Sequence, residues 1–267
     1  MRFEKWQALG NDYVIVEDEQ LPFELTPARV IALCAPHTGI GADGVLHLSR
    51  TEDPGFAARL RIFNPDGSEA ELSGNGAREA VLYLRRAGWT DQRQFSVHTA
   101  AGEIRPTILS ETTCRVDMGR ARDEGRGEIA GYGYQQVGVG NPQCSIRVDS
   151  QEQLASISLG EVGPLIENDA RFPNRTNVSF WTELAGDRIL ARIFERGVGE
   201  TEASGTGACG AAVAHVLRGG DSPVTVVLDG GELEVEVGED LHIDLTGAAE
   251  PVYAGQLAPE LLARLAS

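Results

Sequence analysis

The chain has 267 residues, 42% of them hydrophobic, and its 40 acidic residues against 23 basic ones give a formal net charge of −17. So negative a chain is a poor candidate for nucleic-acid binding, because contacts to phosphates require a basic face. Its apolar runs are short and interrupted by charge, and the N-terminal MRFEKWQALGND lacks the apolar core of a secretory signal. We expect a cytoplasmic protein of one large or two ordinary domains, without membrane or nucleic-acid partners.

The chain has few lysines and no metal-ligand spacing, and both features limit the chemistry that it can use. Lys5 is the only lysine, which argues against a Schiff-base lysine for pyridoxal phosphate and against the lysine of a phosphate-binding P-loop. The four cysteines and five histidines are scattered, without the spacing of metal ligands. The sequence therefore predicts a protein that works with no cofactor and no metal.

The predicted elements of the first half alternate between strands and helices. Apolar or alternating runs predict strands over residues 14–18 and 58–63, and a helix fits 27–35 between them. An S-G-N-G-A string begins at Ser73, and a helical stretch follows over 78–88 and ends in glycine.

The second half repeats this order. Strands are expected over 145–149 and 188–194, and a second S-G-x-G-A string begins at Ser204 and leads into a helical stretch over 209–220. The remaining predicted elements are a hairpin over 225–237 and a last helix over 259–265.

These repetitions indicate a duplicated chain. A Gly-Asn pair recurs 130 residues later, and the tripeptide RIF and the S-G-x-G-A string each recur 131 residues later. Three matches in the same order and nearly the same register predict two homologous halves. We expect an α+β fold of two pseudo-symmetric domains, 1–118 and 119–267, each a strand-rich layer around one central helix. The last helix is free to pack back on the N-terminal half.

The two S-G-x-G-A strings suggest an anion site. Glycines in a first helical turn let backbone N–H groups approach a ligand, and a helix N-terminus favours negative charge. If the two helix starts face each other, Ser73 and Ser204 flank one carbon of a small zwitterion. That geometry suits the removal of a proton from one face and its return to the other. Serine is also among the best N-cap residues, so either string taken alone is better explained as a helix cap.

A dinucleotide site is the competing interpretation of the second string. Residues 205–210 fit the pattern G-x-G-x-x-G, and Asp229 ends an apolar strand at about the required spacing. However, no strand leads directly into Gly205, and the first-half copy has Glu79 in place of the third glycine. We therefore set this interpretation aside.

Longer strings of the chain resemble the diaminopimelate epimerase family. They are LGNDYVIVED, GIGADGVL, RIFNPDGSEAELSGNGAR, GNPQC, RFPNRTNVSF and ERGVGETEASGTGACGAAVA, in order and across nearly the whole chain. The resemblance implies two similar domains with the active site in the cleft between them. It also implies an isomerase that inverts an α-carbon of diaminopimelate, LL to meso, without cofactor, in the lysine and peptidoglycan precursor pathway. Family members often pair, so the resemblance implies a homodimer.

Taken position by position, the resemblance implies a set of site residues. Glu195 is a polar partner beside the reacting groups, and Arg196 pairs with the distal carboxylate of the substrate. The backbone N–H groups that hold the reacting end belong to Gly74, Asn75, Gly205 and Thr206. The asparagine side chains that contact substrate are Asn11, Asn64, Asn141 and Asn177. Taken singly, an asparagine is as often a turn or cap residue, and Arg196 could equally be a surface ion-pair residue.

The chain departs from the family at the reacting groups. Ser73 and Ser204 stand where the family has its two catalytic cysteines, and Gln143 stands where it has a histidine. An alcohol is a far weaker acid than a thiol, so an unassisted serine pair should abstract an α-proton poorly. The predicted catalytic set is thus Ser73, Ser204, Glu195 and Gln143.

Three explanations of the serines stay open. The cysteines could have been replaced to trap a complex. The chain could be a divergent isomerase whose base is Glu195, acting directly or through Ser204. It could also bind its ligand without the reaction. A racemase or isomerase of another small amino acid is the alternative to a diaminopimelate epimerase.

Overall fold

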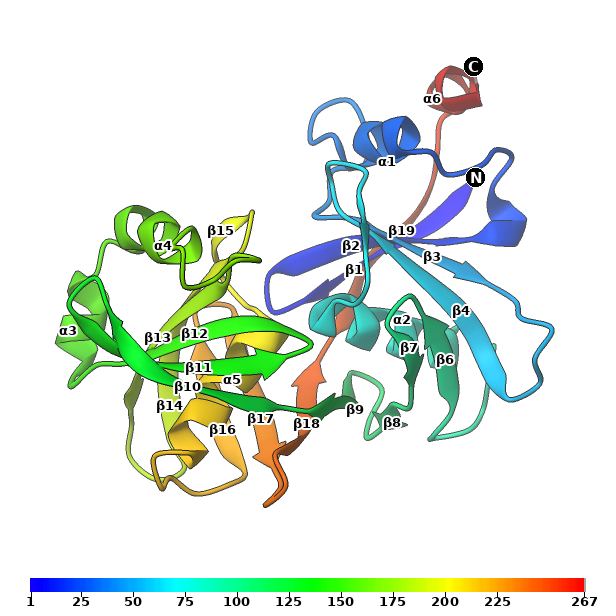
Figure 1. The fold of residues 1–267 in the computed structure, drawn as a ribbon. Coiled ribbons are helices and arrows are strands. Elements are labelled where there is room, and N and C mark those ends of the chain that lie inside the picture. Colours follow the sequence, from blue (N-terminus) through cyan, green and yellow to red (C-terminus); the bar gives the residue numbers. More distant parts are fainter. Residues whose placement is uncertain (267) are drawn as a thin grey trace. The chain divides into compact units, whose positions relative to one another are not determined.

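The computed structural model describes residues 1–266 and forms two compact units (Figure 1). The first unit comprises Met1–Val116 together with the segment that begins at Ala248, and the second comprises Asp117–Gly247. Among residues 1–266, every helix is too short or too polar to span a bilayer.

The first unit is built on an 8-stranded mixed sheet with the order β19-β1-β2-β3-β4-β6-β7, and β5 pairs with β4. The β1–β2 hairpin turns through Leu9 and Gly10, whose φ angles of 57° and 87° are those of a type I′ turn. This tight turn makes Asn11 the first residue of β2. The strands are β1 Arg2–Ala8, β2 Asn11–Glu17, β3 Val45–Ser49, β4 Phe56–Phe63, β5 Glu69–Ala70, β6 Ser96–Thr99, β7 Gly102–Ile104 and β19 Glu250–Gln256.

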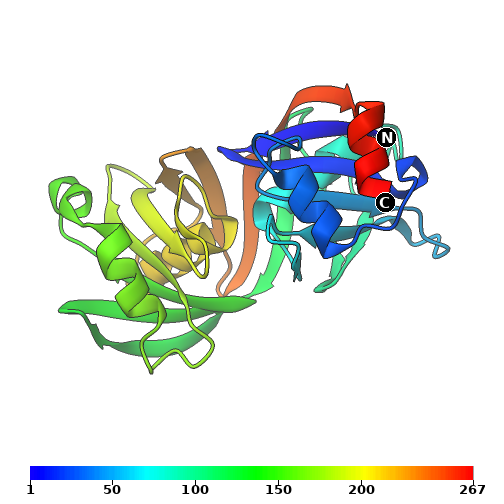
Figure 2. The ribbon, with the colours of Figure 1, turned by 90° about the horizontal axis from the view of Figure 1, so that it is seen from above.

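Helices cover both faces of this sheet. The central helix α2 packs on β1, β2 and β3, while α1 and α6 lie side by side on the other face (Figure 2). A short 3-10 helix, η1, follows β2. The bounds are η1 Asp18–Gln20, α1 Pro27–Cys34, α2 Gly74–Arg86 and α6 Pro259–Ala266.

The two-sided covering determines where the side chains of β2 point. Val14 and Val16 belong to the core cluster that also includes residues of α1 and α6. Because side chains alternate along a strand, Tyr13 points to the opposite face, toward α2. All three are buried, as expected for a strand that is covered on both faces.

Strand β19 brings the end of the chain back to the first unit. It pairs antiparallel with β1, with Arg2 opposite Gln256 and Gln7 opposite Glu250. The predicted boundary places 119–267 in the C-terminal half, with only the last helix free to return, whereas in the structure the whole strand β19 returns as well. The physical reason is that β1 would otherwise be an unpaired sheet edge.

The second sheet has 11 strands in the order β10-β11-β12-β13-β14-β16-β17-β18-β9-β8, and β15 pairs with β14. Most neighbours are antiparallel, but β12 and β13 run parallel, as do β14 and β16. The strands are β8 Thr107–Ile108, β9 Thr113–Arg120, β10 Arg122–Ile129, β11 Tyr132–Val139, β12 Asn141–Arg147, β13 Asn177–Glu183, β14 Arg188–Glu195, β15 Gly199–Thr201, β16 Val224–Leu228, β17 Gly231–Val237 and β18 His242–Ala248.

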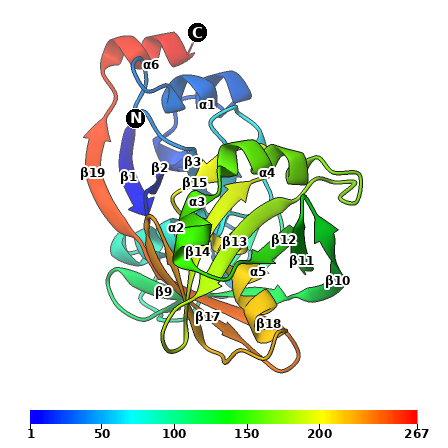
Figure 3. The same cartoon turned by 90° about the vertical axis from the view of Figure 1, so that its left-hand side faces the viewer.

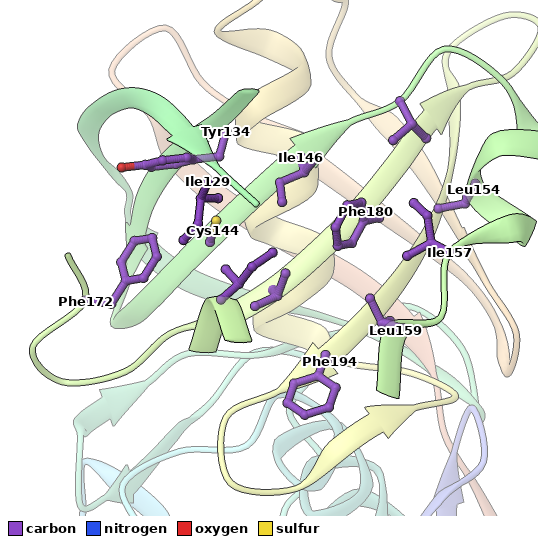
Figure 4. Close-up of a cluster of buried hydrophobic side chains, with 13 residues drawn as sticks. Ile129, Tyr134, Cys144, Ile146, Leu154, Ile157, Leu159, Phe172, Phe180 and Phe194 are labelled. Carbon is purple, nitrogen blue, oxygen red and sulfur yellow. The ribbon is translucent and has the colours of Figure 1, made fainter. Parts of the chain in front are cut away.

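The second unit repeats the arrangement of helices. Its central helix α5 (Gly205–Val216) packs on strands β11 to β14, β16 and β17 (Figure 3), and its many glycine and alanine residues let these strands come close. Helices α3 (Gln151–Ser156) and α4 (Leu159–Glu167) pack on β13. They share a cluster of buried apolar side chains with β12 and β13 (Figure 4).

Strand β12 shows the same alternation as β2. Cys144 and Ile146 belong to the cluster in Figure 4, so Gln143 and Ser145 point to the opposite face, toward α5. Consistent with this, a Cβ atom added at Gly210 of α5 would lie 2.8 Å from Cγ of Gln143. Tyr13 and Gln143 therefore occupy corresponding places in the two units.

Candidate active site

In the first unit, Ser73 is the N-cap of α2. Its backbone is extended (φ −128°, ψ 124°), and its Oγ accepts a hydrogen bond of 3.1 Å from the backbone N–H of Gly76. This cap explains why α2 begins at Gly74, four residues before the predicted start at 78. The phenol of Tyr13 donates a second hydrogen bond to Oγ of Ser73, at 3.2 Å. The Ser73 side chain is only half-buried, whereas Tyr13 is 5% exposed.

A chain of amides lies beside this cap. Asn75 donates to Oδ1 of Asn11 at 3.2 Å, and Asn11 donates to Asp43 at 2.9 Å. The guanidinium of Arg78 donates to Oδ1 of Asn75 at 2.9 Å and to the carbonyl of Gly74 at 3.1 Å. The structure therefore gathers the predicted residues Asn11, Ser73, Gly74 and Asn75 at one helix start.

The hydrogen bonds of Asn64 are made within a turn and not with this group of amides. Its side chain donates to Oγ of Ser68 at 2.9 Å, and its backbone bonds to Ser68 and Gly67 close a turn after β4. These contacts are the ones expected of an asparagine in a turn. Its predicted contact with substrate stays a prediction.

Glu79 on α2 is fully buried, and neither carboxylate oxygen has a hydrogen-bond partner of good geometry among the described residues. Burial raises the pKa of Glu79 well above its ordinary value, and the charges of Asp12 and Asp43 act in the same direction. The charge of Arg78 and the backbone N–H of Tyr13 act against the shift. Burial is the largest cause, so the protein favours the protonated form of Glu79 more than water does.

In the second unit, Ser204 is the N-cap of α5. Its Oγ accepts a hydrogen bond of 3.2 Å from the backbone N–H of Gly207, and the residue is 2% exposed. Thr206, in the same turn, accepts hydrogen bonds from Asn141 at 3.3 Å and from Asn177 at 3.5 Å. These amides thus meet at the helix start.

Gln143 is fully buried beside this group. Its amide donates to Oδ1 of Asn141 at 2.6 Å, and its Oε1 receives no hydrogen bond from the described residues. A carboxamide does not titrate, so it cannot replace a histidine in proton transfer. Its geometry instead suits it to orient Asn141, and its predicted catalytic role stays a prediction.

Glu195 and Arg196 follow one another at the end of β14. Oε1 of Glu195 accepts a hydrogen bond from Thr201 at 3.0 Å, which orients a partly buried carboxylate. The backbone N–H of Arg196 donates to Asn177 at 2.8 Å, and its exposed guanidinium donates to the carbonyl of Asn174 at 2.9 Å. Within residues 1–266 the structure gives Arg196 no carboxylate partner, so its charge is available to an anionic ligand.

Three residues around the start of α2 are not predicted as site residues from the sequence: Tyr13, Arg78 and Glu79. Tyr13 lies within one of the strings that resemble the family, but no local pattern indicates that its hydroxyl reaches Ser73. Glu79 gave a signal, because it breaks the glycine pattern of the duplicated motif. Arg78 gave none, since a buried arginine is rare enough that a surface position is the default expectation.

Solved structures share this fold. A Bacillus anthracis phenazine biosynthesis protein of the PhzF family superposes with a TM-score of 0.74 at 16% identity, over 97% of this chain and 99% of that one. A hydroxyproline epimerase from Agrobacterium vitis, with bound trans-4-OH-L-proline, gives 0.73 at 15% identity, over 97% and 92%. At such identities the likeness shows the fold alone, and it confirms the predicted class of two related strand-rich α+β units.

The sequence comparisons are more specific. The family described as diaminopimelate epimerase matches residues 3–123 and 136–252. The diaminopimelate epimerase of Pelotomaculum thermopropionicum is 40% identical over 281 residues, 96% of this chain and 98% of that one. The diaminopimelate epimerase of Synechocystis sp. is 38% identical over 278 residues, with the same coverage. The chain therefore belongs to the diaminopimelate epimerase family, which confirms the resemblance in the sequence.

Proposed function

We propose that this protein is a diaminopimelate epimerase: an isomerase that inverts one α-carbon of diaminopimelate, LL to meso, in the lysine and peptidoglycan precursor pathway. The reaction is a two-base proton transfer and uses no cofactor. The observation that carries the proposal is the pair of serine-capped, glycine-rich helix starts, one in each unit of a chain that belongs to this family.

The helix starts supply the anion-binding part of the mechanism. The first N–H groups of an α-helix have no carbonyl partner within the helix, and the positive end of the helix dipole adds to their attraction for an anion. Gly74, Asn75, Gly205 and Thr206 provide these groups. They hold the carboxylate at the reacting carbon and stabilise the negative charge that develops there when the proton leaves.

The remaining residues bind and orient the substrate. Arg196 pairs with the distal carboxylate, because its guanidinium is exposed and lacks a carboxylate partner in the described chain. A second amino-carboxylate end is what distinguishes diaminopimelate from a simple amino acid. The asparagine amides hydrogen-bond the substrate from Asn11, Asn64, Asn141 and Asn177.

Proton transfer requires Ser73 and Ser204 to act on opposite faces of the α-carbon. Serine hydroxyls are weak acids, so each needs an acid–base partner. In the second unit we assign this role to Glu195, whose carboxylate is partly buried and oriented by Thr201. Gln143 supports the same half of the site through Asn141.

The decisive experiment is α-proton exchange. The protein is incubated with LL- or meso-diaminopimelate in D₂O, the α-proton signal is followed by NMR, and binding is measured by calorimetry. Deuterium incorporation with inversion supports the proposal. Binding without exchange indicates a ligand-binding homologue, and neither exchange nor binding indicates another substrate.

The serines are tested by restoring the thiols. The double variant Ser73→Cys/Ser204→Cys should raise the rate of epimerisation by about 10²-fold, because a thiol is much closer to a working base at neutral pH. Cys144 and Cys209 are buried and serve as an internal check, since Cys144→Ser and Cys209→Ser should not change the exchange rate. An unchanged rate in the double variant would remove both serines from the mechanism.

The proposal extends to the setting of the protein. We place it in the cytoplasm, where its substrate is made and used, and expect it to pair as a homodimer. Light scattering that gives twice the mass of the chain would support the pairing, and the mass of a single chain would contradict it.

A further inference from the structure

Ser73 has an unusual neighbour. Both hydrogen bonds that the structure gives its Oγ are donated to it, one by the backbone N–H of Gly76 and one by the phenol of Tyr13. The hydroxyl hydrogen of Ser73 is therefore not needed for either bond and can be directed at a ligand. Two donors on one oxygen also favour a partial negative charge on that oxygen.

Tyr13 is held firmly in this place. It lies on β2 directly under α2, and its ring packs against Gly44, where an added Cβ would lie 2.5 Å from Cε1 of the ring. It is 5% exposed, whereas Ser73 is half-buried. A ligand can thus reach Ser73 more readily than Tyr13, so that Tyr13 acts through the serine.

The second unit lacks this pair. Gln143 occupies the corresponding place, and its amide is bonded to Asn141. The hydrogen bond given for the Ser204 side chain comes from Gly207. A phenol at the serine is thus a feature of the first unit only, and a repeated structural requirement of the fold does not explain it.

We propose that Tyr13 is the acid–base partner of Ser73, so that a two-residue proton relay in the first unit takes the place of a single thiol. The inference rests on the proposed function and names a residue that the mechanism above does not use. It is reasonable chemically because a phenol, with an ordinary pKa of about 10, ionises far more readily than an aliphatic alcohol.

The proton movements balance. When the first unit returns a proton, the O–H bond of Ser73 breaks as the C–H bond forms, and the carbanion electron pair becomes that bond. The phenol proton of Tyr13 moves to Oγ of Ser73 in the same step. Ser73 ends as a neutral hydroxyl and Tyr13 as a phenolate. When the first unit removes a proton, each step runs in reverse, and a phenolate is consumed.

Several charged or titratable groups surround the relay. On α2 they are Arg78 and Glu79, and burial raises the pKa of Glu79. On the strands, Asp12 forms an ion pair with Lys5 at 2.8 Å. The groups of the neighbouring loop and of α1 are Asp43 and Cys34, which interact with Asp12. Because proton removal needs the phenolate, the exchange rate should rise with pH into the range where a phenol ionises.

The first test removes one oxygen atom. Tyr13→Phe should lower the exchange rate by about 10²-fold while substrate binding and thermal stability change little. The matched control is Tyr83→Phe, which removes another buried phenol of the same unit, one that bonds to Glu17. This control should keep the wild-type rate. A fluorinated tyrosine of lower phenol pKa at position 13 should move the rising limb of the pH profile to lower pH, which a structural role would not do.

A second test does not depend on activity. In Ser73→Cys, the pH dependence of iodoacetamide labelling reports the ionisation of the new thiol. The native cysteines are buried, and burial raises the pKa of Cys34 and of Cys114 to about 12, so they stay unlabelled at neutral pH. Adding Tyr13→Phe should shift the labelling midpoint to higher pH, because the thiolate loses a donor. Tyr13→Phe should also cost less activity in this variant than in the serine protein.

The outcomes separate the two proposals. If the protein exchanges the α-proton and Tyr13→Phe matches it in rate and pH profile, the relay is wrong and the proposed function stands. Equal losses in the serine and cysteine proteins would also overturn the relay. If the unsubstituted protein shows no exchange, the proposed function fails. The labelling midpoint then decides: a shift supports a phenol that tunes position 73, and an unshifted midpoint removes that role.

Discussion

The two helix starts share a backbone and differ in what is packed beneath it. Ser73 and Ser204 have nearly the same angles (φ −128°, ψ 124° against φ −137°, ψ 119°), and each caps the third N–H of its helix. Beneath α2 lies the large Tyr13, and beneath α5 lies Gln143, which fills the space beside Gly210. The duplication has therefore preserved the backbone geometry of the helix starts while the surrounding side chains diverged.

The divergence extends along the helices. The position of Glu79 in the first unit corresponds to Gly210 in the second, and that of Arg78 corresponds to Cys209. One unit thus holds a buried cation and a buried acid where the other holds a thiol and a glycine. A two-base reaction does not require identical halves, because one group removes the proton and the other returns it.

The largest expected effect comes from the second unit. Glu195→Gln should lower α-proton exchange by about 10²- to 10⁴-fold, because the amide cannot accept a proton, and should leave binding by calorimetry nearly unchanged. Glu202→Gln, an exposed acid nearby in the chain, is the control and should exchange normally. Loss of binding in Glu195→Gln would make this residue a ligand-holding group and leave the second unit without its base.

The next largest effect tests the buried cation of the first unit. Arg78→Ala should lower the free energy of unfolding by about 3 kcal/mol, because the carbonyl of Gly74 and the amide oxygen of Asn75 lose a charged donor. Urea unfolding measures the change, and Arg86→Ala, on the exposed end of α2, should stay within about 0.5 kcal/mol of wild type. A loss below about 1 kcal/mol for Arg78→Ala would contradict the role given to these bonds.

A smaller effect tests the packing under α5. Gly210→Ala places a Cβ 2.8 Å from Cγ of Gln143 and should destabilise the protein by about 1 to 3 kcal/mol. Gly160→Ala is the matched control, since its added Cβ meets no atom within 4 Å, and should stabilise helix α4 by up to about 1 kcal/mol. Thermal unfolding measures the change in stability of each variant. Equal changes would show that the Gln143 side chain moves aside at little cost.

The last effect concerns Glu79 and varies with pH. Its pKa is raised in the folded state, so between its ordinary pKa of 4.5 and the folded value the unfolded chain binds fewer protons. The free energy of unfolding therefore falls as pH rises through this window. Glu79→Gln removes the fall, which is about 1.4 kcal/mol for each unit of pKa difference. Urea unfolding gives the free energy of unfolding at pH 5 and at pH 8. Relative to wild type, Glu79→Gln should be more stable at pH 8 than at pH 5, whereas the exposed Glu52→Gln should differ from wild type equally at both pH values.

Much of the fold could be predicted from the sequence because the signals were local or repeated. The alternation of apolar residues indicated the strands that include β2 and β12, and the repeat at 130 to 131 residues indicated two related units. The helix starts were predicted at 78 and 209, too late, because the glycine-rich first turn has a low helix propensity that the serine cap and the strands beneath offset.

The sequence alone determined the duplication, the family and the two serines at helix starts, since each is a matter of residue order and type. The tertiary structure decided which strand returns to β1, that Arg78 and Glu79 are buried, and that the phenol of Tyr13 reaches Ser73 across 60 residues of chain. These features depend on which faces of distant elements pack together. Such packing is a property of the assembled layers, and no local pattern of residues encodes it.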